Sequence, residues 1–274
     1  MANKRFAQFT AASEMKDSDI LLINDGNGVK KVTVAEFRGV TGAGSRNGIY
    51  RGKYLGDSYT ADQKAAIAAG TFEDLYIGDY WTIDGVNYRI AAFDYWLNTG
   101  DTDHVVTDHH VVIVPDTNLD DQKMNDSNVT TGAYVGSKMY TTYMATAKNK
   151  VKAAFGDPNI LTCRDYLANA TSNGRPSAGA WYDLRIDLMN EHMVYGSKFF
   201  EPTSDGTNIP CVYSTCKTIL PLFLLKPDLI CNRANWWLRD VVSTTLFAYV
   251  GYNGVAYFNS ASYADGVRPA FAIH

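Results

Sequence analysis

Acidic residues and histidines crowd the stretch from 101 to 110, and side chains of these types can hold a metal ion when they converge. The residues are Asp101, Asp103, His104, Asp108, His109 and His110. Their spacing matches no zinc-binding pattern, and His110 opens a β-branched run whose alternate residues belong in a core. We therefore expect a solvated loop that ends in a buried, hydrogen-bonded histidine, and we predict no metal site here.

A second acidic stretch begins with the Asp-x-Asn-x-Asp pattern of a calcium-binding loop, at Asp116, Asn118 and Asp120. An EF-hand loop requires Gly at its sixth position and Glu at its twelfth, where this chain has Asp121 and Ser127. The stretch therefore fails as an EF-hand. A looser calcium site between Asp116 and Asp121 stays open.

No residue pattern in the chain predicts catalysis. The motifs G-x-S-x-G and H-E-x-x-H, the P-loop and the dinucleotide-binding fingerprint do not occur. Cys163 has no histidine nearby in the sequence that could activate it as a nucleophile. Asp183 and Asp187 flank Arg185 within a helix predicted over residues 181–195, and their spacing is typical of a solvated helix face. The prediction is a protein that is not an enzyme and takes no cofactor.

The bulk composition narrows the choice of partners. The 274 residues carry a net charge of −4 and no cluster of Lys and Arg, which argues against nucleic acid as a partner. The most apolar stretch, residues 219–225, contains Pro and is too short to cross a bilayer, so no membrane insertion is expected. No apolar run of signal-peptide length follows the start, and we expect synthesis in a cytoplasm. The four cysteines are expected to be buried thiols, although Cys211 and Cys216 could meet across a turn.

A glycine-rich stretch divides the chain. Residues 1–38 are predicted to form a small β-rich unit, with a hairpin turn at 24–28 and a Thr33–Glu36 capping box that begins a helical turn. A unit of this size buries too little surface to be stable alone and needs a partner or self-association. Residues 39–48 contain four glycines and are predicted to be a linker, and residues 49–274 form the large domain.

The large domain is predicted to be α+β, because helices and antiparallel hairpins follow one another without regular βαβ alternation. The predicted helices are one that begins at the Thr60 capping box and two that cover residues 139–155 and 181–195. The predicted strands and extended segments are 80–88 with a type I′ turn at Asp84-Gly85, 110–114, 212–225 and short strands over 236–273.

The C-terminal stretch has the composition of a recognition surface. It opens with NWWLR at 235–239 and closes with GVRPAF at 266–271. Between these ends, residues 240–265 are rich in Tyr, Phe, Ser, Thr, Asn and Gly and contain no Lys, Glu, Gln, Met or Trp. Tyr offers a large contact area at low entropic cost, and Ser, Asn and Gly adapt their hydrogen bonds to a partner. At least one ring of the Trp pair is expected in the core, and Arg239 and Arg268 are expected to pair with buried carboxylates or carbonyls.

The two end motifs and the segment between them resemble the C-terminal variable region of phage-encoded proteins that are diversified by retroelements. These are variable proteins with a C-type-lectin fold, of the subtype related to formylglycine-generating enzyme. Residues 80–90 and 131–137 are similar to bacterial and prophage relatives that share this domain, so the resemblance covers roughly residues 46–274. Residues 1–38 look like the attachment segments of phage tail or fibre proteins.

The resemblance implies how the composition of the segment arose. In that family template adenines are randomised during reverse transcription, and the resulting codons cannot encode Lys, Glu, Gln, Met or Trp. About three residues of these types would be expected in 240–265 at the composition of the whole chain, and there are none. The sugar-binding motifs E-P-N, Q-P-D and W-N-D of C-type lectins do not occur, and the catalytic cysteines of formylglycine-generating enzyme are not recognisable. Neither activity is therefore carried over with the fold.

The resemblance places a diversified ligand-binding surface at about residues 235–271. The positions expected to face inward are Val241, Ala248, Val250, Gly254, Ala256 and Ala261. The positions expected to contact a ligand are Val242, Ser243, Thr244, Thr245, Leu246, Phe247, Gly251, Tyr252, Asn253, Val255, Tyr257, Phe258, Asn259, Ser262, Tyr263, Ala264 and Asp265.

The implied function is that of a receptor-binding tail or fibre protein of a phage or prophage, made in the bacterial cytoplasm and assembled into the virion. Its partner would be a bacterial cell-surface protein or glycan, and residues 1–38 could join copies into a homo-oligomer. Two alternatives stay open. A lectin-fold enzyme of the formylglycine-generating or sulfatase-modifying type would have a deep pocket with a metal or a reactive cysteine. A purely structural tail component would bury residues 240–265 in an assembly.

Overall fold

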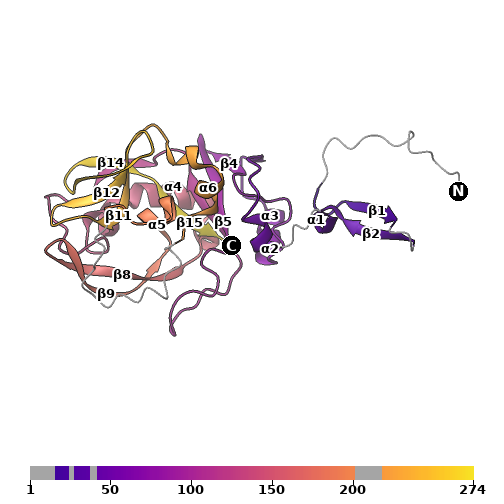
Figure 1. Cartoon of the computed structure of the whole chain (residues 1–274), viewed down its shortest axis with the longest axis horizontal. Coiled ribbons are helices and arrows are strands. Elements are labelled where there is room, and N and C mark those ends of the chain that lie inside the picture. The colour runs from indigo at the N-terminus through magenta and orange to yellow at the C-terminus, as the bar shows by residue number, and fades with distance from the viewer. Residues whose placement is uncertain (1–15, 25–27, 38–41, 201–217) are drawn as a thin grey trace.

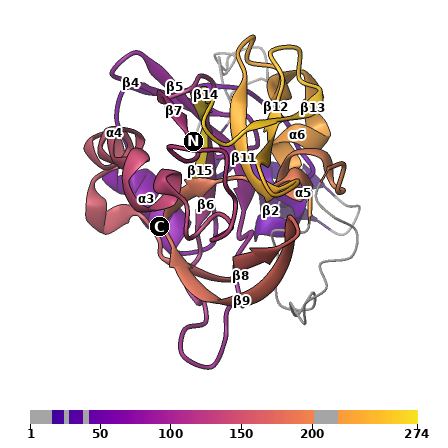
Figure 2. The same cartoon turned by 90° about the vertical axis from the view of Figure 1, so that its left-hand side faces the viewer.

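The computed structural model of the chain describes residues 16–24, 28–37, 42–200 and 218–274. Of these described residues, 37% lie in strands and 21% in helices, so the predicted α+β class is confirmed. Two sheets form the body of the molecule. A hairpin of residues 20–24 and 29–33 projects from it, and a second hairpin of residues 163–184 curves along one side of it (Figures 1 and 2). Within the described residues, no helix is long and apolar enough to cross a membrane.

The larger sheet has six strands in the order β10-β15-β6-β5-β4-β3. They are β3 (Tyr54–Gly56), β4 (Tyr80–Ile83), β5 (Val86–Phe93), β6 (Val111–Pro115), β10 (Ile186–Leu188) and β15 (Pro269–Ile273). All neighbours are antiparallel except β3 and β4. The predicted hairpin at Asp84-Gly85 is confirmed, because both residues have positive φ, 49° and 76°, as a type I′ turn requires. The predicted central strand is β6, and every residue in it is buried.

The second sheet has five short strands in the order β13-β12-β11-β14-β7 and contains the C-terminal segment. They are β7 (Asp120–Lys123), β11 (Trp236–Val241), β12 (Leu246–Val250), β13 (Ala256–Ser260) and β14 (Ala264–Val267). The short strands predicted over 236–273 are therefore confirmed. Because β14 runs directly into β15, one segment of chain joins the two sheets.

The remaining elements are two hairpins and a set of short helices. The hairpins pair β1 (Ile20–Asn24) with β2 (Val29–Thr33) and β8 (Cys163–Ser172) with β9 (Arg175–Leu184). The α-helices are α1 (Val34–Phe37), α2 (Gly42–Arg46), α3 (Ala61–Ala68), α4 (Ala145–Phe155), α5 (Glu191–Tyr195) and α6 (Pro221–Leu225). A π-helix, η2 (Met139–Tyr143), precedes α4, and the 3-10 turns are η3 (Asp157–Asn159) and η5 (Pro227–Ile230).

Capping residues begin two helices where they were predicted. Thr60 Oγ1 accepts from the Gln63 N–H at 3.3 Å, and the Gln63 side chain accepts from the Thr60 N–H at 3.0 Å. The same reciprocal pair joins Thr33 and Glu36 at the start of α1. The helix predicted over 139–155 is confirmed as η2 followed by α4.

The helix predicted over 181–195 is wrong for most of its length. These residues form the end of β9, then β10, and only Glu191–Tyr195 is helical. Asn173 and Gly174 have φ values of 52° and 73° and join β8 to β9 as an Asn-Gly turn. The apolar residues after the turn are buried by strand pairing, because β10 pairs with the distant strand β15. That partner lies more than 80 residues later and leaves no local signal in the sequence.

Two further segment predictions need correction. Residues 221–225, predicted as strand or extended core, form the helix α6, and Pro221 opens it at a position where proline is favoured. Residues 212–217 of that prediction, with Cys211 and Cys216, lie outside the described residues. Within the predicted linker 39–48, residues 42–46 form α2, and residues 39–41 lie outside the described part.

A buried ion pair attaches the N-terminal hairpin to the large domain. Arg46 Nη2 lies 2.9 Å from Asp17 Oδ2, and the two side chains are 2% and 3% exposed. Asp17 also accepts from the Tyr76 hydroxyl at 2.7 Å and from the Asp74 N–H at 3.1 Å. The hydrogen bonds from Tyr76 and Arg46 hold the pKa of Asp17 below its usual value, although burial opposes them. The hairpin is therefore fixed to the domain through its first residues.

Candidate binding surface

Two buried tryptophans support the C-terminal sheet on both of its faces. Trp236 and Trp237 are neighbours on β11, so their rings lie on opposite faces, and both side chains are fully buried. The Trp237 Nε1–H donates to the carbonyl of Gln122 at 2.8 Å. The Arg268 guanidinium lies 5.0 Å from the centre of the Trp236 ring. The prediction of at least one ring in the core is confirmed for both.

Arg239 and Arg268 pair with a buried carboxylate and with backbone carbonyls, as predicted, and we call such buried supporting residues of the C-terminal sheet its frame. Arg239 Nη2 lies 3.0 Å from Asp165 Oδ2 of β8, and both side chains are buried. Arg268 is 1% exposed and donates to three carbonyls at 2.8 to 3.3 Å. These acceptors are the backbone oxygens of Pro115, Leu229 and Ile230. Burial lowers the pKa of Arg268 to about 10, so the side chain stays charged at neutral pH.

A network of amides and one carboxylate joins β11, β13 and β14. Asp265, 6% exposed, accepts from the side-chain amides of Asn259 at 2.9 Å and Asn235 at 3.2 Å. Burial raises the pKa of Asp265, and the two amide hydrogen bonds oppose that shift. At the next residue, Gly266, an added Cβ would lie 1.7 Å from the side-chain nitrogen of Asn118. Glycine is required here because the network fills the space beside its Cα.

The predicted contact positions divide into exposed and covered groups. The most exposed side chains are Tyr252 (67%), Tyr263 (61%), Val255 (57%) and Tyr257 (52%). The other exposed positions are Thr244, Asn253, Ser262 and Ala264. The half-buried positions are Val242, Ser243, Thr245, Leu246, Phe258 and Asn259.

Three of the predicted contact residues are buried, and the prediction is wrong for them. Phe247 is fully buried and lies on β12, the strand between β11 and β13. Gly251 begins the turn after β12, and its N–H donates to the carbonyl of Val255 at 2.8 Å. Asp265 is held in the amide network. Of the positions predicted to face inward, Gly254 is half-buried and the other five are buried.

Residues outside segment 240–265 contact the backbone of its loops and hold it in place. The hydroxyl of Thr130 donates to the carbonyl of Ser243 at 2.7 Å. The turn of the β8–β9 hairpin packs so closely that a Cβ on Gly174 would lie 2.5 Å from the backbone nitrogen of Thr244. Ser262 donates from both its N–H and its hydroxyl to the side-chain oxygen of Asn128. The exposed positions are therefore presented on loops with fixed backbones.

Sequence reasoning missed two aromatic residues that adjoin this surface. The Phe200 ring centre lies 5.1 Å from that of Phe258 and 6.3 Å from that of Tyr257. Phe199 is 59% exposed. The available signal was a pair of adjacent aromatic residues outside every predicted helix and strand, because contiguous exposed apolar side chains often mark an interaction site.

His110 is buried and hydrogen-bonded, as predicted. Its Nδ1–H donates to the carbonyl of Asp108 at 2.9 Å, and its Nε2 accepts from the Trp96 N–H at 3.0 Å. Because both ring nitrogens have these roles, the imidazole is held in its neutral form. Burial lowers the pKa of His110 below its usual value.

The other members of the acidic and histidine-rich stretch do not meet at one point. Asp101 and Asp103 both face Arg164 of β8, at 2.8 and 3.4 Å. His109 Nδ1 lies 2.8 Å from Asp94 Oδ2 on the other side of the loop. Throughout residues 16–24, 28–37, 42–200 and 218–274, no three His, Cys, Asp or Glu side chains are placed to hold a metal ion.

The residues of the calcium-like stretch are also bound elsewhere. Asp116 forms a two-point ion pair with Arg89, and the side chain of Asn118 donates to the carbonyl of Asn235 at 2.9 Å. Asp120 lies in β7 and accepts from the N–H of Asp121. The stretch thus connects the two sheets instead of closing around a central point.

Asp183 and Asp187 do not share a helix face, and that prediction is wrong. Asp183 lies on β9 and pairs with Arg164 at 3.0 Å. Asp187 lies on β10, is 7% exposed, and accepts from the Tyr134 hydroxyl at 3.1 Å. Burial raises the pKa of Asp187.

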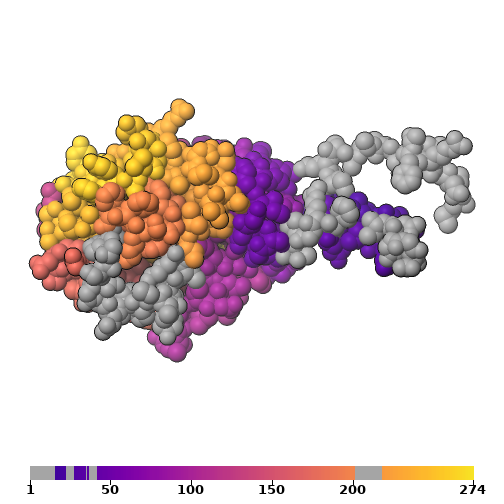
Figure 3. All heavy atoms as spheres, in the orientation of Figure 1, coloured from indigo at the N-terminus to yellow at the C-terminus, as the bar shows by residue number. Residues whose placement is uncertain are grey.

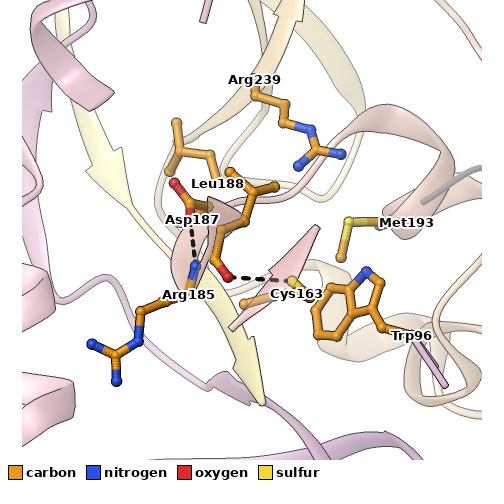
Figure 4. Close-up of a pocket in the computed structure, with 9 residues that line it drawn as sticks. Trp96, Cys163, Arg185, Asp187, Leu188, Met193 and Arg239 are labelled. Atoms are coloured by element: carbon orange, nitrogen blue, oxygen red, sulfur yellow. Dashed lines mark hydrogen bonds between the residues drawn. The ribbon is translucent and has the colours of Figure 1, made fainter. Parts of the chain in front are cut away.

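A small pocket between β10, α5 and the start of β8 contains the side chain of Cys163 (Figure 4). Its lining residues are Trp96, Cys163, Leu184, Arg185, Asp187, Leu188, Met193, Arg239 and Ala270. The Cys163 thiol donates to the carbonyl of Leu184 at 3.4 Å, and Asp187 accepts from the Arg185 N–H at 3.1 Å. These lining residues include one carboxylate, Asp187, and no histidine.

Comparison with known protein families gives a match to the second half of the large domain. The family described as "Domain of unknown function (DUF6273)" matches residues 163–274. This span begins at β8 and includes every lining residue of the pocket except Trp96 and the whole C-terminal sheet except β7. No curated protein and no solved structure matches the chain.

Proposed function

We propose that this chain is the receptor-binding protein of a phage or prophage tail or fibre, with a ligand-binding surface diversified by a retroelement. The observation that carries the proposal is the division of residues 235–271 into two sets. Residues 236–239 and 266–271 are buried, as are Phe247, Ala248 and Val250 of β12. In contrast, Tyr252, Val255, Tyr257 and Tyr263 are more than half exposed. A fixed frame with exposed, aromatic-rich loops is the arrangement that a replaceable binding surface requires.

The C-type-lectin fold is part of the same proposal. Supporting it are the α+β class and the sheet of short strands that contains the C-terminal segment. Further support comes from the chain end, since β15 returns from that sheet to lie between β10 and β6 in the larger sheet.

The surface binds by apolar contact and neutral hydrogen bonds, without chemistry. The two acidic residues of segment 240–265, Asp240 and Asp265, are 8% and 6% exposed, and the segment contains no basic residue. Its exposed part therefore carries no formal charge. Such a surface suits a bacterial cell-surface protein or glycan and does not suit nucleic acid, which is bound through its phosphates.

The arrangement of the molecule supports attachment at one end and recognition at the other. The β1–β2 hairpin projects from the end opposite the β11–β14 sheet, as Figures 1 and 3 show. Ile20, Leu22 and Val29 on this hairpin are 59%, 68% and 68% exposed. Residues 1–38 join copies or attach them to the virion through this apolar hairpin. Several copies on one particle then raise avidity by about 10²–10⁴ over a single site.

Two experiments test the proposal. Sequencing around the gene should reveal a near-copy of the segment that encodes residues 240–265, beside a reverse transcriptase gene and different mainly at adenines. In the second experiment, residues 240–265 are replaced by the segment of a natural variant, and labelled protein is bound to intact bacterial cells. Target choice should follow the graft. If it stays with the frame while the fold is retained, the proposal is refuted.

A further inference from the structure

We infer that the ligand surface extends beyond residues 240–265 onto an aromatic anchor formed by Tyr195, Phe199 and Phe200, and that its partner is an uncharged, apolar patch on a folded protein. This inference rests on the proposed function, because it assumes that the C-terminal face binds a ligand. Beyond the proposed function, it adds three residues outside segment 240–265 to the binding face and specifies the chemical class of the partner.

A buried carboxylate holds the anchor in place. Glu191 is fully buried at the start of α5, and its two carboxylate oxygens accept from the backbone N–H groups of Phe199 and Phe200 at 2.8 and 3.0 Å. The N–H of Glu191 in turn donates to Asp240 of β11 at 2.7 Å. Charge-assisted hydrogen bonds of this kind are stronger than neutral ones. The turn with the two Phe residues is therefore fixed relative to the C-terminal sheet.

Ring contacts connect the anchor to the exposed positions of the segment. The Phe200 ring meets Phe258 edge to face with ring centres 5.1 Å apart, and Phe258 stacks on Tyr257 at the same distance. The Phe199 ring packs against that of Tyr195 in α5, with ring centres 5.2 Å apart. The Tyr195 hydroxyl donates to the carbonyl of residue 254 at 3.0 Å, in the turn that presents Tyr252 and Val255. These two sets of ring contacts meet at the Phe199-Phe200 peptide and together connect α5 with β13.

The size of this surface favours a protein partner. Phe199, Tyr252, Val255 and Tyr257 are each 52–67% exposed. A large aromatic side chain offers about 150–250 Å², so the three aromatic residues leave roughly 300–400 Å² exposed, and Val255 adds to this area. A patch of roughly 300–600 Å² on a monomer is often functional. It matches the apolar centre of a standard interface, which buries about 800 Å² per partner.

The exposed part of segment 240–265 carries no charge, and this further restricts the class of partner. The centre of a protein interface is depleted of charged residues and enriched in Tyr and Phe, with a polar rim around it. Asn253 and Ser262 are exposed polar residues of the same segment and suit such a rim. An anionic cell-surface polymer would instead be met by Lys and Arg, which residues 240–265 lack.

Single substitutions in the full chain test the inference. Phe199→Ser removes an exposed ring while Tyr257 and Phe258 keep their contacts, and Phe200→Ala removes the ring that packs on them. Tyr257→Ala tests the segment itself. Tyr54→Ala is the matched control, because Tyr54 is 51% exposed, also contacts another Tyr ring, and lies on β3 of the other sheet. Thermal unfolding verifies that each variant is folded.

The probe is a panel of intact bacterial strains that includes the strain encoding the chain, and binding of fluorescent protein is measured by flow cytometry. Phe199→Ser, Phe200→Ala and Tyr257→Ala are each expected to weaken apparent affinity about tenfold or more, as interface hot spots do, and Tyr54→Ala to leave it unchanged. Treating the cells with proteinase K should abolish binding, and periodate oxidation of their glycans should not.

Each other outcome overturns a defined part of the reasoning. If Tyr257→Ala weakens binding and both Phe variants do not, the anchor is refuted while the proposed function stands. If periodate abolishes binding and proteinase K does not, the partner is a glycan and the inferred protein class is wrong. If no variant changes binding, or no strain is bound, the proposed function fails as well.

Discussion

Phe247 separates the frame of the C-terminal sheet from the surface that the frame presents. The residue lies within segment 240–265, so its position in the sequence suggests a replaceable contact residue. In the structure its side chain is fully buried on the interior strand β12, opposite Val241 on one side and Asn259 on the other. Phe247→Ala should therefore reduce stability, whereas Tyr257→Ala, on the neighbouring strand, should reduce binding.

The expected size of the effect follows from burial. A buried Phe replaced by Ala typically destabilises a protein by about 3–5 kcal/mol, because transfer free energy is lost and a cavity remains. In a domain of this size that corresponds to a fall in Tm of roughly 6–20 °C. Tyr257 is 52% exposed, so Tyr257→Ala removes little buried area and should reduce stability by at most about 1 kcal/mol.

Urea unfolding, followed by tryptophan fluorescence, measures both variants against the unsubstituted chain. Trp236 and Trp237 are two of the five tryptophans and are fully buried in this sheet, so its loss changes the total emission. The reasoning is refuted if Phe247→Ala loses less than about 1 kcal/mol, or if Tyr257→Ala loses as much as Phe247→Ala. The first result would mean that Phe247 does not contribute to the core, and the second that Tyr257 contributes to stability as much as a buried residue does.

Three further predictions concern other parts of the frame. Gly266→Ala should destabilise the fold by about 1–3 kcal/mol in urea unfolding, because its Cβ would lie 1.7 Å from the Asn118 side chain; a neutral result would contradict the packing of β14. Asp17→Ala leaves Arg46 buried without its carboxylate and should cost about 3–5 kcal/mol, with faster amide exchange in β1 and β2; unchanged exchange would show that the hairpin is not attached through this pair. His110 has a lowered pKa in the folded state, so the unfolded chain binds the proton more tightly. Stability is therefore complete above a pH of about 6.5 and is lost as pH falls from there toward the folded pKa, by up to about 1.4 kcal/mol per pH unit. His110→Asn should remove this part of the pH dependence between pH 7.5 and 5.5, and an unchanged slope would contradict it.

Local signals predicted the parts of the fold that local chemistry determines. The capping boxes at Thr60 and Thr33, the turn at Asp84-Gly85 and the buried strand β6 each depend on residues a few positions apart. The helix predicted over residues 181–195 failed because those residues are placed by pairing with β15, which lies far away in the sequence. The apolar spacing fits both a helix and a strand, and only the distant partner decides between them.

Burial within the C-terminal segment was predicted only in part for a similar reason. Small residues such as Ala248 and Ala261 were correctly expected to face inward, because small apolar residues fit where backbones approach closely. Phe247 and Asp265 could not be assigned from residue type, since aromatic and acidic residues occur on binding surfaces as readily as in this frame. Their burial depends on strand order and on the Asn235 and Asn259 amides, which the sequence does not bring together.

The exposed and the buried positions of segment 240–265 differ in how much substitution the fold tolerates. Eight positions of segment 240–265 that were predicted to contact a ligand are exposed. A substitution at an exposed site typically changes stability by within about 0.5 kcal/mol, so all eight together alter it by at most about 4 kcal/mol, and less where signs differ. A domain is usually stable by about 5–15 kcal/mol, whereas the single loss of Phe247 removes about 3–5 kcal/mol. Random change at the exposed positions is therefore compatible with folding, and the same change at the buried positions of the same segment is not. A diversified population of this chain should accordingly vary at Tyr252 and Tyr257 and keep Phe247 and Asp265.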